Sequence, residues 1–413
     1  MWSRLRIDLS WRDLLFATFS AFFPTSRERL QQVLEEEWSN GHNDALVCLS
    51  VRSGLDLLFR TLNLPEGSEV LYSAITIPNM FHIAEAHGLV PVPVDLNEQY
   101  RVSSQALDTA CSPRSRVLIV AHLFGDCGDL TDVLAFAREH QLLVVEDCAQ
   151  AWCSPVWRGD GQADVSLFSF GSIKTATALG GALCRIRDPQ LLARMRKTLG
   201  TDPISSRWNY LLKILKYVLL KFLTVPVVYV GFLWWNQWRG RDPDCVVGRL
   251  TRGFPPGELL PTLRQRPCAP LLGLLKRRLR TYHPKRTLRR HIIGTRLWKA
   301  AHGTQGGDNG VFRHHSFWLV PILTTEPNEL VKRLRQNGFD ATTRGRLEVV
   351  PPPRDRPELA CVQAETFLAE TVFVPCYPEL TDRAVARLEG VLRLHQREIG
   401  RLTENTAVEG TGN

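Results

Sequence analysis

Several metal, redox and targeting patterns are missing from this sequence of 413 residues. Its ten cysteines form no Cys-x-x-Cys pair and no zinc-ligand spacing, so we expect no metal site. Most of them lie in apolar runs such as ALVCLS and GGALCRI, which is typical of buried thiols in a reducing compartment. The apolar stretch LLFATFSAFF lacks a small-residue cleavage pattern, so we expect no signal peptide. These absences favour a cytoplasmic protein.

Repeats and low-complexity linkers are also missing. The 29 glycines and 25 prolines are scattered, which excludes a solenoid. With 44% hydrophobic residues, the chain can form one large and one smaller domain. The net charge of +9 raises nucleic acid as a partner. However, the basic residues concentrate around 239–299 and alternate with leucines at helical spacing, which indicates a solvated helix face. We therefore expect no nucleic-acid partner.

Apolar runs alternate with amphipathic segments between about residues 44 and 200. The runs ALVCLS, EVLYSA, PVPVDL, RVLIVAHLFG and LLVVED are predicted strands, separated by predicted helices. This alternation predicts an α/β domain with a mainly parallel sheet in three layers and with ligands at the carboxyl ends of the strands. Residues 313–400 instead contain strands and helices typical of a smaller α+β domain.

The sequence predicts one large domain, one small domain and an apolar insert between them. In chain order we expect an N-terminal segment packed on the small domain (1–43), the large domain (44–202), the insert (203–262), a connecting helix (263–300), the C-terminal small domain (301–400) and a flexible tail (401–413).

The most apolar stretch of the chain lies at 208–238, inside the insert. Only Lys221 is charged between Tyr217 and Trp235, so the length approaches the roughly 20 residues needed to cross a bilayer. A simple span would place two parts of one folded unit on opposite sides of the membrane, and Pro226 would break the helix. We expect an element that lies on a membrane surface or re-enters it, with a subunit interface or a lid as the alternative.

Asp147 and Lys174 are the candidates for chemistry. Asp147 follows the predicted strand LLVVED, and Lys174 lies in FSFGSIKTATALGG. An acid and a lysine are what pyridoxal 5'-phosphate (PLP) requires: the lysine holds the aldehyde, and the acid keeps the pyridine nitrogen protonated. An aspartate at a strand end also serves metals, ribose or helix caps. A P-loop is excluded in GSIKT, because Ile173 precedes the lysine where that motif needs glycine.

A phosphate site is the third component that PLP needs. Ser53 and Gly54 in RSGLDLLF lie at the start of a predicted helix, where free N–H groups favour an anion. Ser-Gly before a helix is more often a plain N-cap. Ser169, five residues before the lysine, could add a hydroxyl.

In this order, the sequence strings resemble the DegT/StrS family of PLP-dependent nucleotide-sugar aminotransferases, which have the aspartate-aminotransferase-like fold (fold type I). The resemblance covers roughly 45–200 and 265–395. It rests on RSGLDLL, YSAITIPNMFHIAEAHGLVPVPVDL, VLIVAHLFGDCGDL, VVEDCAQAW, GQADVSLFSFGSIKTATALGGAL, GFDATT and VFVPCYPEL.

The resemblance implies a role for each matching residue. Lys174 would carry PLP as a Schiff base and act as the general base, Asp147 would pair with the pyridine nitrogen, and Gln150 would contact the phenolic oxygen. The phosphate would be held by Ser169 and by the backbone of Ser53 and Gly54.

Three positions depart from the family pattern. Leu55 replaces the usual threonine, Ile77 replaces the aromatic ring that stacks on PLP, and Leu179 replaces a glutamate before the paired glycines. The insert also replaces the segment that, in the family, contacts the phosphate of the partner subunit.

The resemblance implies an aminotransferase of polysaccharide biosynthesis that works as a homodimer. An amino acid, commonly glutamate, would donate its amino group, and a keto sugar nucleotide or a similar polar keto compound would receive it. The alternative is a membrane-associated PLP-binding scaffold with reduced or altered catalysis, which the departures and the insert motivate.

Overall fold

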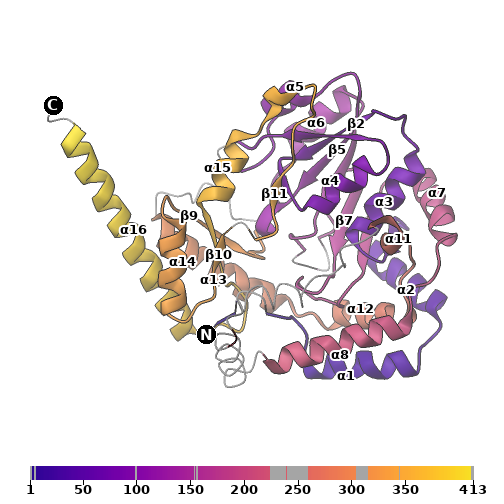
Figure 1. The fold of residues 1–413 in the computed structure, drawn as a ribbon. Coiled ribbons are helices and arrows are strands. Elements are labelled where there is room, and N and C mark those ends of the chain that lie inside the picture. Colours follow the sequence, from indigo (N-terminus) through magenta and orange to yellow (C-terminus); the bar gives the residue numbers. More distant parts are fainter. Residues whose placement is uncertain are drawn as a thin grey trace.

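The computed structural model describes residues 2–3, 6–97, 100–152, 154, 157–223, 239, 259–303, 315–343 and 345–410. These residues fold into a large α/β domain and a smaller α+β domain, which lie next to each other in Figure 1.

A seven-stranded sheet forms the centre of the large domain. In spatial order its strands are β1 (Ala45–Cys48), β8 (Ala182–Ile186), β7 (Val165–Ser169), β6 (Leu143–Asp147), β5 (Ser115–Ala121), β2 (Glu69–Ser73) and β4 (Val90–Val94). β8 is antiparallel to both of its neighbours, and every other pair is parallel. The mainly parallel sheet predicted from the alternating pattern is therefore confirmed.

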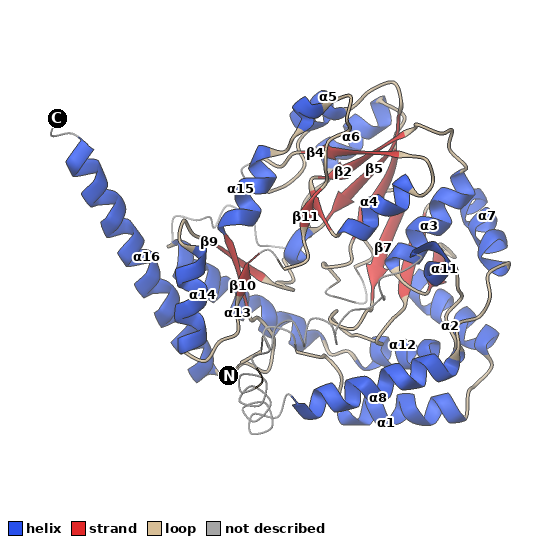
Figure 2. Ribbon diagram, viewed as in Figure 1, coloured by secondary structure: helices blue, strands red, loops and turns tan. Residues whose placement is uncertain are grey.

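Helices cover both faces of this sheet (Figure 2). The helices that lie between or after its strands are α3 (Val51–Leu62), α4 (Pro78–Glu85), α5 (Ser104–Ala110), α6 (Thr131–Glu139) and α7 (Pro189–Gly200), with a short 3-10 turn, η1 (Leu123–Gly125). Successive side chains of a strand enter opposite cores: Val70 and Tyr72 of β2 pack on one face, and Leu71 packs on the other. The strands are therefore apolar on both faces, as parallel strands between helix layers must be.

The N-terminal helices pack on the large domain. α1 (Trp11–Phe22) lies against α12 (Ala269–Thr281) and α8 (Arg207–Leu223), and α2 (Arg27–Ser39) lies against α12 and β1. The structure thus differs from the predicted placement of residues 1–43 on the small domain. Their apolar faces share one core with α12 and α8, and this shared burial decides the placement.

Trp2 and Arg6 reach the small domain, in contrast to the two helices that follow. The Trp2 backbone donates to the Gly338 carbonyl and accepts from the Asp340 N–H. Arg6 pairs with Glu379 at 3.8 Å.

The small domain contains a three-stranded antiparallel sheet with helices around it. Its strands, in spatial order, are β10 (Thr342–Thr343), β12 (Thr371–Val374) and β9 (Val320–Leu323). Its helical elements are α13 (Pro284–His302), α14 (Pro327–Gln336), η2 (Pro357–Leu359), α15 (Val362–Glu370) and α16 (Asp382–Gly410). A short ribbon of β11 (Glu348–Val349) and β3 (Ile75–Thr76) joins the two domains.

The predicted connecting helix and tail differ from the structure. The region 263–300 contains two helices, α12 and α13, because the chain is extended at Tyr282 and His283 and restarts a helix at Pro284. The predicted flexible tail begins inside α16, which continues as helix to Gly410.

Most of the described part of the insert is helical. It comprises α8 and the short α11 (Leu259–Leu263), while residues 224–238 of the predicted membrane element lie outside the described residues. Among the described helices, none combines the length and apolar character that a membrane span requires.

Candidate active site

The carboxyl ends of the parallel strands bring predicted site residues to one edge of the large sheet. Asp147 is the last residue of β6, and Ser169 is the last residue of its parallel neighbour β7. Lys174 follows in the loop of residues 170–181 that leads to β8; we call this the lysine loop. This edge is where open α/β sheets bind their ligands.

Lys174 and Asp147 influence each other's charge. Removal from water lowers the pKa of Lys174 to about 8; the Asp147 carboxylate opposes this shift, and Arg52 adds to it. Removal from water raises the pKa of Asp147, while the Ala149 N–H, 2.9 Å from Oδ1, and the Lys174 charge act in the opposite direction. The lowered pKa gives Lys174 more of the neutral, nucleophilic amine near pH 7 than an ordinary lysine has.

Side chains from distant parts of the chain hold the lysine loop in place. Four of them bind it directly: Asp8 accepts from the Ala176 N–H (2.8 Å), Arg290 donates to Thr175 Oγ1 (2.6 Å), Tyr210 donates to the Ala178 carbonyl (2.7 Å), and Trp318 donates to the Ile173 carbonyl (3.1 Å). Ala176 and Leu179 adopt left-handed φ values of 52° and 59°, which cost energy in residues other than glycine. The surrounding bonds therefore determine the shape of this loop.

Trp318 is a site residue that sequence reasoning missed. Its ring centroid lies 4.0 Å from Lys174 Nζ, close enough for a cation–π contact. The Ser316 N–H donates to the Gly125 carbonyl at 2.7 Å, and a side chain at Gly125 would collide with this segment. The string HHSFWLVPIL shows a strand but carries no signal for this crossing between the domains.

Gln150 lies three residues beyond the end of β6 and accepts a hydrogen bond from the turn after β5. Its Oε1 accepts from the Phe124 N–H at 2.9 Å, and Phe124 has a left-handed φ of 60°. The amide nitrogen of the same side chain carries two donors for the predicted contact with the phenolic oxygen, which stays a prediction.

α3 begins earlier than predicted, and the N–H groups predicted to hold the phosphate already have an acceptor within the protein. The helix begins at Val51, and the N-cap Ser50 accepts from the N–H groups of Ser53 (3.1 Å, at Oγ) and Gly54 (3.0 Å, at the carbonyl). A Cβ at Gly54 would lie 3.0 Å from Cys184 Sγ, so this glycine lets α3 approach β8 closely. Phosphate contacts from Ser53, Gly54 and Ser169 stay predictions.

Two of the three departures from the family pattern are core residues. Leu55 and Leu179 are both fully buried. Leu55 lies in the core that α3 forms with the large sheet, and Leu179 lies in the core that includes α12. Ile77 lies just before Pro78 at the start of α4 and packs partly against the same core as Leu55. Its predicted contact with the cofactor ring stays a prediction.

Arg52 adds positive charge beside Lys174, and Lys213 adds positive charge near Arg52 and Gly180 of the lysine loop. Removal from water lowers the pKa of Arg52 to about 10, with Arg346 adding to the shift. Removal from water, together with Lys216 and Arg52, lowers the pKa of Lys213 to about 8. Crowded, desolvated cations of this kind favour a bound anion. Sequence reasoning missed both residues, because Lys213 lies in the apolar insert and only the fold brings it to the lysine loop.

A buried His–Glu pair lies beneath the site edge. Ligand atoms of His122, Glu146 and Cys148 lie within 4.8 Å of one another. Glu146, however, accepts from His122 Nε2 (2.7 Å), Ser166 Oγ (2.7 Å) and the Asp160 N–H (3.0 Å). Its carboxylate is thus engaged in hydrogen bonds, and we interpret the cluster as a support for β6.

The pair shifts both pKa values. Burial alone would lower the pKa of His122, but the hydrogen bond and charge of Glu146 raise it overall. Burial alone would raise the pKa of Glu146, but His122, Ser166 and the Asp160 N–H lower it overall. Both charged forms are therefore stabilised in the fold.

Glu146→Ala should lower the free energy of unfolding by about 3–5 kcal/mol, because it leaves a buried histidine and a buried hydroxyl without their acceptor. Urea unfolding followed by tryptophan fluorescence measures this difference. The difference in unfolding free energy between wild type and Glu146→Ala should become smaller at low pH, where Glu146 becomes protonated below its lowered pKa. It should also become smaller at high pH, where His122 loses its proton above its raised pKa. Glu146→Gln, which keeps the size and an acceptor, should cost less; equal stability of Glu146→Ala and wild type would contradict the structural role.

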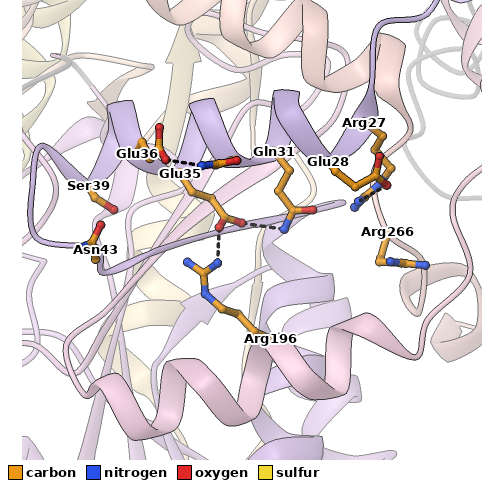
Figure 3. A pocket seen from close by; sticks show the side chains of 10 residues that line it. Arg27, Glu28, Gln31, Glu35, Glu36, Ser39, Asn43, Arg196 and Arg266 are labelled. Atoms are coloured by element: carbon orange, nitrogen blue, oxygen red, sulfur yellow. Dashed lines mark hydrogen bonds and ion pairs between the residues drawn. The ribbon is translucent and has the colours of Figure 1, made fainter.

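A separate polar groove of about 440 Å³ lies between α2 and α7 (Figure 3). Glu35 lies at its centre, where it accepts from Gln31 Nε2 (2.9 Å) and the Val47 N–H (3.1 Å) and pairs with Arg196 (2.6 Å). These bonds tie α2 to β1 and α7. None of the lining residues is a predicted site residue, and we assign the groove a structural role.

Comparison with known proteins agrees with this arrangement. The model of the DegT/DnrJ/EryC1/StrS aminotransferase family matches residues 27–207, which include Lys174, Asp147 and the start of α3. The family resemblance predicted from the sequence is therefore confirmed over this part of the chain.

Curated relatives and a solved structure extend the comparison. A GDP-perosamine synthase from Caulobacter vibrioides is 28% identical over 216 residues, which are 49% of this chain and 57% of that protein. A UDP-N-acetyl-3-dehydro-alpha-D-glucosamine 3-aminotransferase from Acidithiobacillus ferrooxidans is 32% identical over 159 residues, 36% of this chain and 42% of that protein. The chain thus spans about half the length of these relatives. The aminotransferase TlmJ from Streptoalloteichus hindustanus shares the fold, with a TM-score of 0.70 and 19% identity, covering 97% of this chain and 100% of that one.

Proposed function

We propose that this chain is a PLP-dependent aminotransferase that moves an amino group from an amino acid to a keto sugar nucleotide or a similar polar keto compound. The observation that carries the proposal is the desolvated amine of Lys174 beside Asp147, at the carboxyl ends of neighbouring parallel strands. The match of this region to an aminotransferase family supports the reaction, and the names of two relatives support the sugar nucleotide.

The donor set fits PLP. The Asp147 carboxylate would hold the pyridine nitrogen, the Lys174 amine would hold the aldehyde, and the Gln150 amide would donate to the phenolic oxygen. Ser169 and the cations at Arg52 and Lys213 would hold the phosphate. When bound, the cofactor ring takes up the electron pair that remains when the substrate carbon loses a proton.

The residues of the chain would position the donor and move the proton. Lys174 Nζ in its neutral form would take the proton from the substrate carbon and pass it to the cofactor carbon that carried the aldehyde. The Trp318 ring, 4.0 Å from that nitrogen, limits where the amine can go. The Asp147 carboxylate, whose charged form the Lys174 charge stabilises, would hold the proton on the ring nitrogen.

Two departures that motivated the scaffold alternative do not remove a site side chain. Leu55 and Leu179 fill the core, and the lysine–acid pair is retained. These facts favour the enzyme over a scaffold.

We also propose that the enzyme works as a homodimer, which the family resemblance supports. Light scattering on the purified protein should give twice the mass of one chain, and a monomer that is fully active would contradict this.

Transfer can be followed directly with glutamate that carries heavy nitrogen. We expect the label to appear in a keto sugar linked to GDP or UDP, detected by mass spectrometry of the amino-sugar product. Label that stays in glutamate with every keto sugar tested would contradict the proposed acceptor class, while label lost to a simple keto acid would keep the aminotransferase and change the acceptor.

Covalent uptake of PLP by the apoenzyme should become faster as the pH rises through about 8 and then level off, because the neutral amine of Lys174 is the reacting form. Stopped-flow absorbance at a series of pH values measures this midpoint. Arg52→Gln removes a neighbouring positive charge, so the midpoint should move to higher pH. A rate that still increases beyond about pH 10, as for an ordinary lysine, would contradict the lowered pKa.

A further inference from the structure

One side of α1 is apolar and exposed along its whole length. Trp11, Leu15, Phe19 and Phe22 recur at helical spacing, and Phe23 follows as the C-cap; they are between 41% and 70% exposed. The opposite side of α1 is buried against α12, so this helix has a packed side and an unpacked apolar side.

α8 repeats this arrangement. Its exposed stripe consists of Trp208, Leu212, Leu215, Leu219 and Phe222, which are between 48% and 65% exposed. Its other side is buried and contacts the lysine loop through Tyr210. An exposed stripe of this kind is not explained by the packing of the domain.

The two stripes form one surface, which we call the α1–α8 face. The helices pack against each other and run antiparallel along one edge of the molecule (Figure 1). The ring centroids of Trp11 and Phe222 are 4.7 Å apart at one end, and those of Phe22 and Trp208 are 5.9 Å apart at the other. Ten half-exposed large side chains leave on the order of 1,000 Å² of apolar surface, where monomeric proteins seldom expose more than a few hundred Å².

The exposed charges on these two helices are all positive. Their exposed charged residues are Arg12 and Arg207, and the three lysines of α8 (Lys213, Lys216 and Lys221) are half-buried. The Arg207 guanidinium lies 4.8 Å from the ring centroid of Trp208. The one acid among the described side chains of α1 and α8, Asp13, is buried and paired with α12. Aromatic and aliphatic side chains flanked by cations match the boundary layer of a membrane with anionic headgroups.

We propose that the α1–α8 face docks on a membrane surface that contains anionic phospholipids, with its apolar stripes inserted among the headgroups. A second copy of this chain is a poorer occupant, because two such faces in contact would oppose cation to cation without an acid to compensate. The proposal does not rest on the proposed aminotransferase activity. It would nevertheless place the lysine loop, which Tyr210 of α8 contacts, close to the membrane.

The test is co-sedimentation of the full chain with phospholipid vesicles. We compare phosphatidylcholine alone with phosphatidylcholine that contains about one third phosphatidylserine. The test variant is Leu15→Gln/Leu212→Gln/Leu219→Gln. The matched control is Leu288→Gln/Val362→Gln/Leu394→Gln, which changes three exposed apolar side chains elsewhere. Circular dichroism checks that each variant is folded, and Lys174→Ala should bind vesicles as well as wild type does.

We expect wild type and the control to sediment with the anionic vesicles and the test variant to bind at least about tenfold less. Binding should also weaken in Arg12→Gln/Arg207→Gln and as salt is raised to about 1 M, where the Debye length falls to about 3 Å. Failure of wild type to bind anionic vesicles, or equal binding by the test variant, would overturn the proposal. So would an oligomer without lipid that dissociates in the test variant, because a second copy would then cover the face.

Discussion

Lys174→Ala should give a folded protein that no longer binds PLP covalently and whose amino transfer is at least about 10³-fold slower. A positioned proton-transfer group alone contributes about 10²–10⁴-fold, and this lysine would also hold the aldehyde. The substitution removes a half-buried side chain, so the fold should survive. The absorbance of the bound cofactor and the rate of amino transfer measure the two effects separately.

Lys213→Ala is the informative comparison for this variant. Lys213 is also desolvated, and its pKa is likewise lowered to about 8, so charge and burial alone do not distinguish the two lysines. We expect Lys213→Ala to keep the covalent cofactor signal and to need a higher PLP concentration, because it would lose a phosphate contact only. A covalent signal that persists in Lys174→Ala and disappears in Lys213→Ala would reverse the assignment.

Asp147→Asn should reduce the rate of amino transfer by about 10²–10⁴-fold, a magnitude comparable to the loss of an acid–base group. An amide does not keep the pyridine nitrogen protonated, so the ring would accept electrons less readily. The variant should still bind PLP through Lys174. Its pH dependence supplies a second readout: the Asp147 charge raises the pKa of Lys174, so its removal should move the midpoint of PLP uptake below about 8.

Asp95→Asn serves as the matched control for Asp147→Asn. Asp95 also follows a parallel strand, β4, but its carboxylate accepts from the N–H groups of Leu96 (2.8 Å) and Ala364 (3.0 Å). We expect amino transfer in this variant to change by less than about twofold. Equal losses in both variants would show that a strand-end aspartate matters here for folding and not for the cofactor.

The sequence predicts the large sheet and the position of Lys174 because both are encoded locally. Strand and helix patterns alternate along the chain, and Asp147 ends one strand while Lys174 follows the next. Parallel strands bring their carboxyl ends together whatever the side chains around them are. These features therefore need no knowledge of long-range packing.

Other parts of the site depend on contacts that no local pattern encodes. Trp318 reaches Lys174 only because its segment crosses from the small domain over Gly125. Lys213 lies in α8, whose leucines and aromatic residues occur on both its buried and its exposed side, so the side that faces the lysine loop is decided by packing. For the same reason the sequence did not predict where α1 packs: one of its apolar sides contacts α12, and the other remains exposed.

The most direct test of the proposed function is the ultraviolet–visible spectrum of the purified protein with PLP, before and after addition of glutamate, beside Lys174→Ala. We expect a cofactor band that requires Lys174 and that converts to the amino form of the cofactor when glutamate is added. A wild-type protein without this band would contradict the enzyme assignment, and a Lys174-dependent band that no amino acid changes would contradict amino transfer.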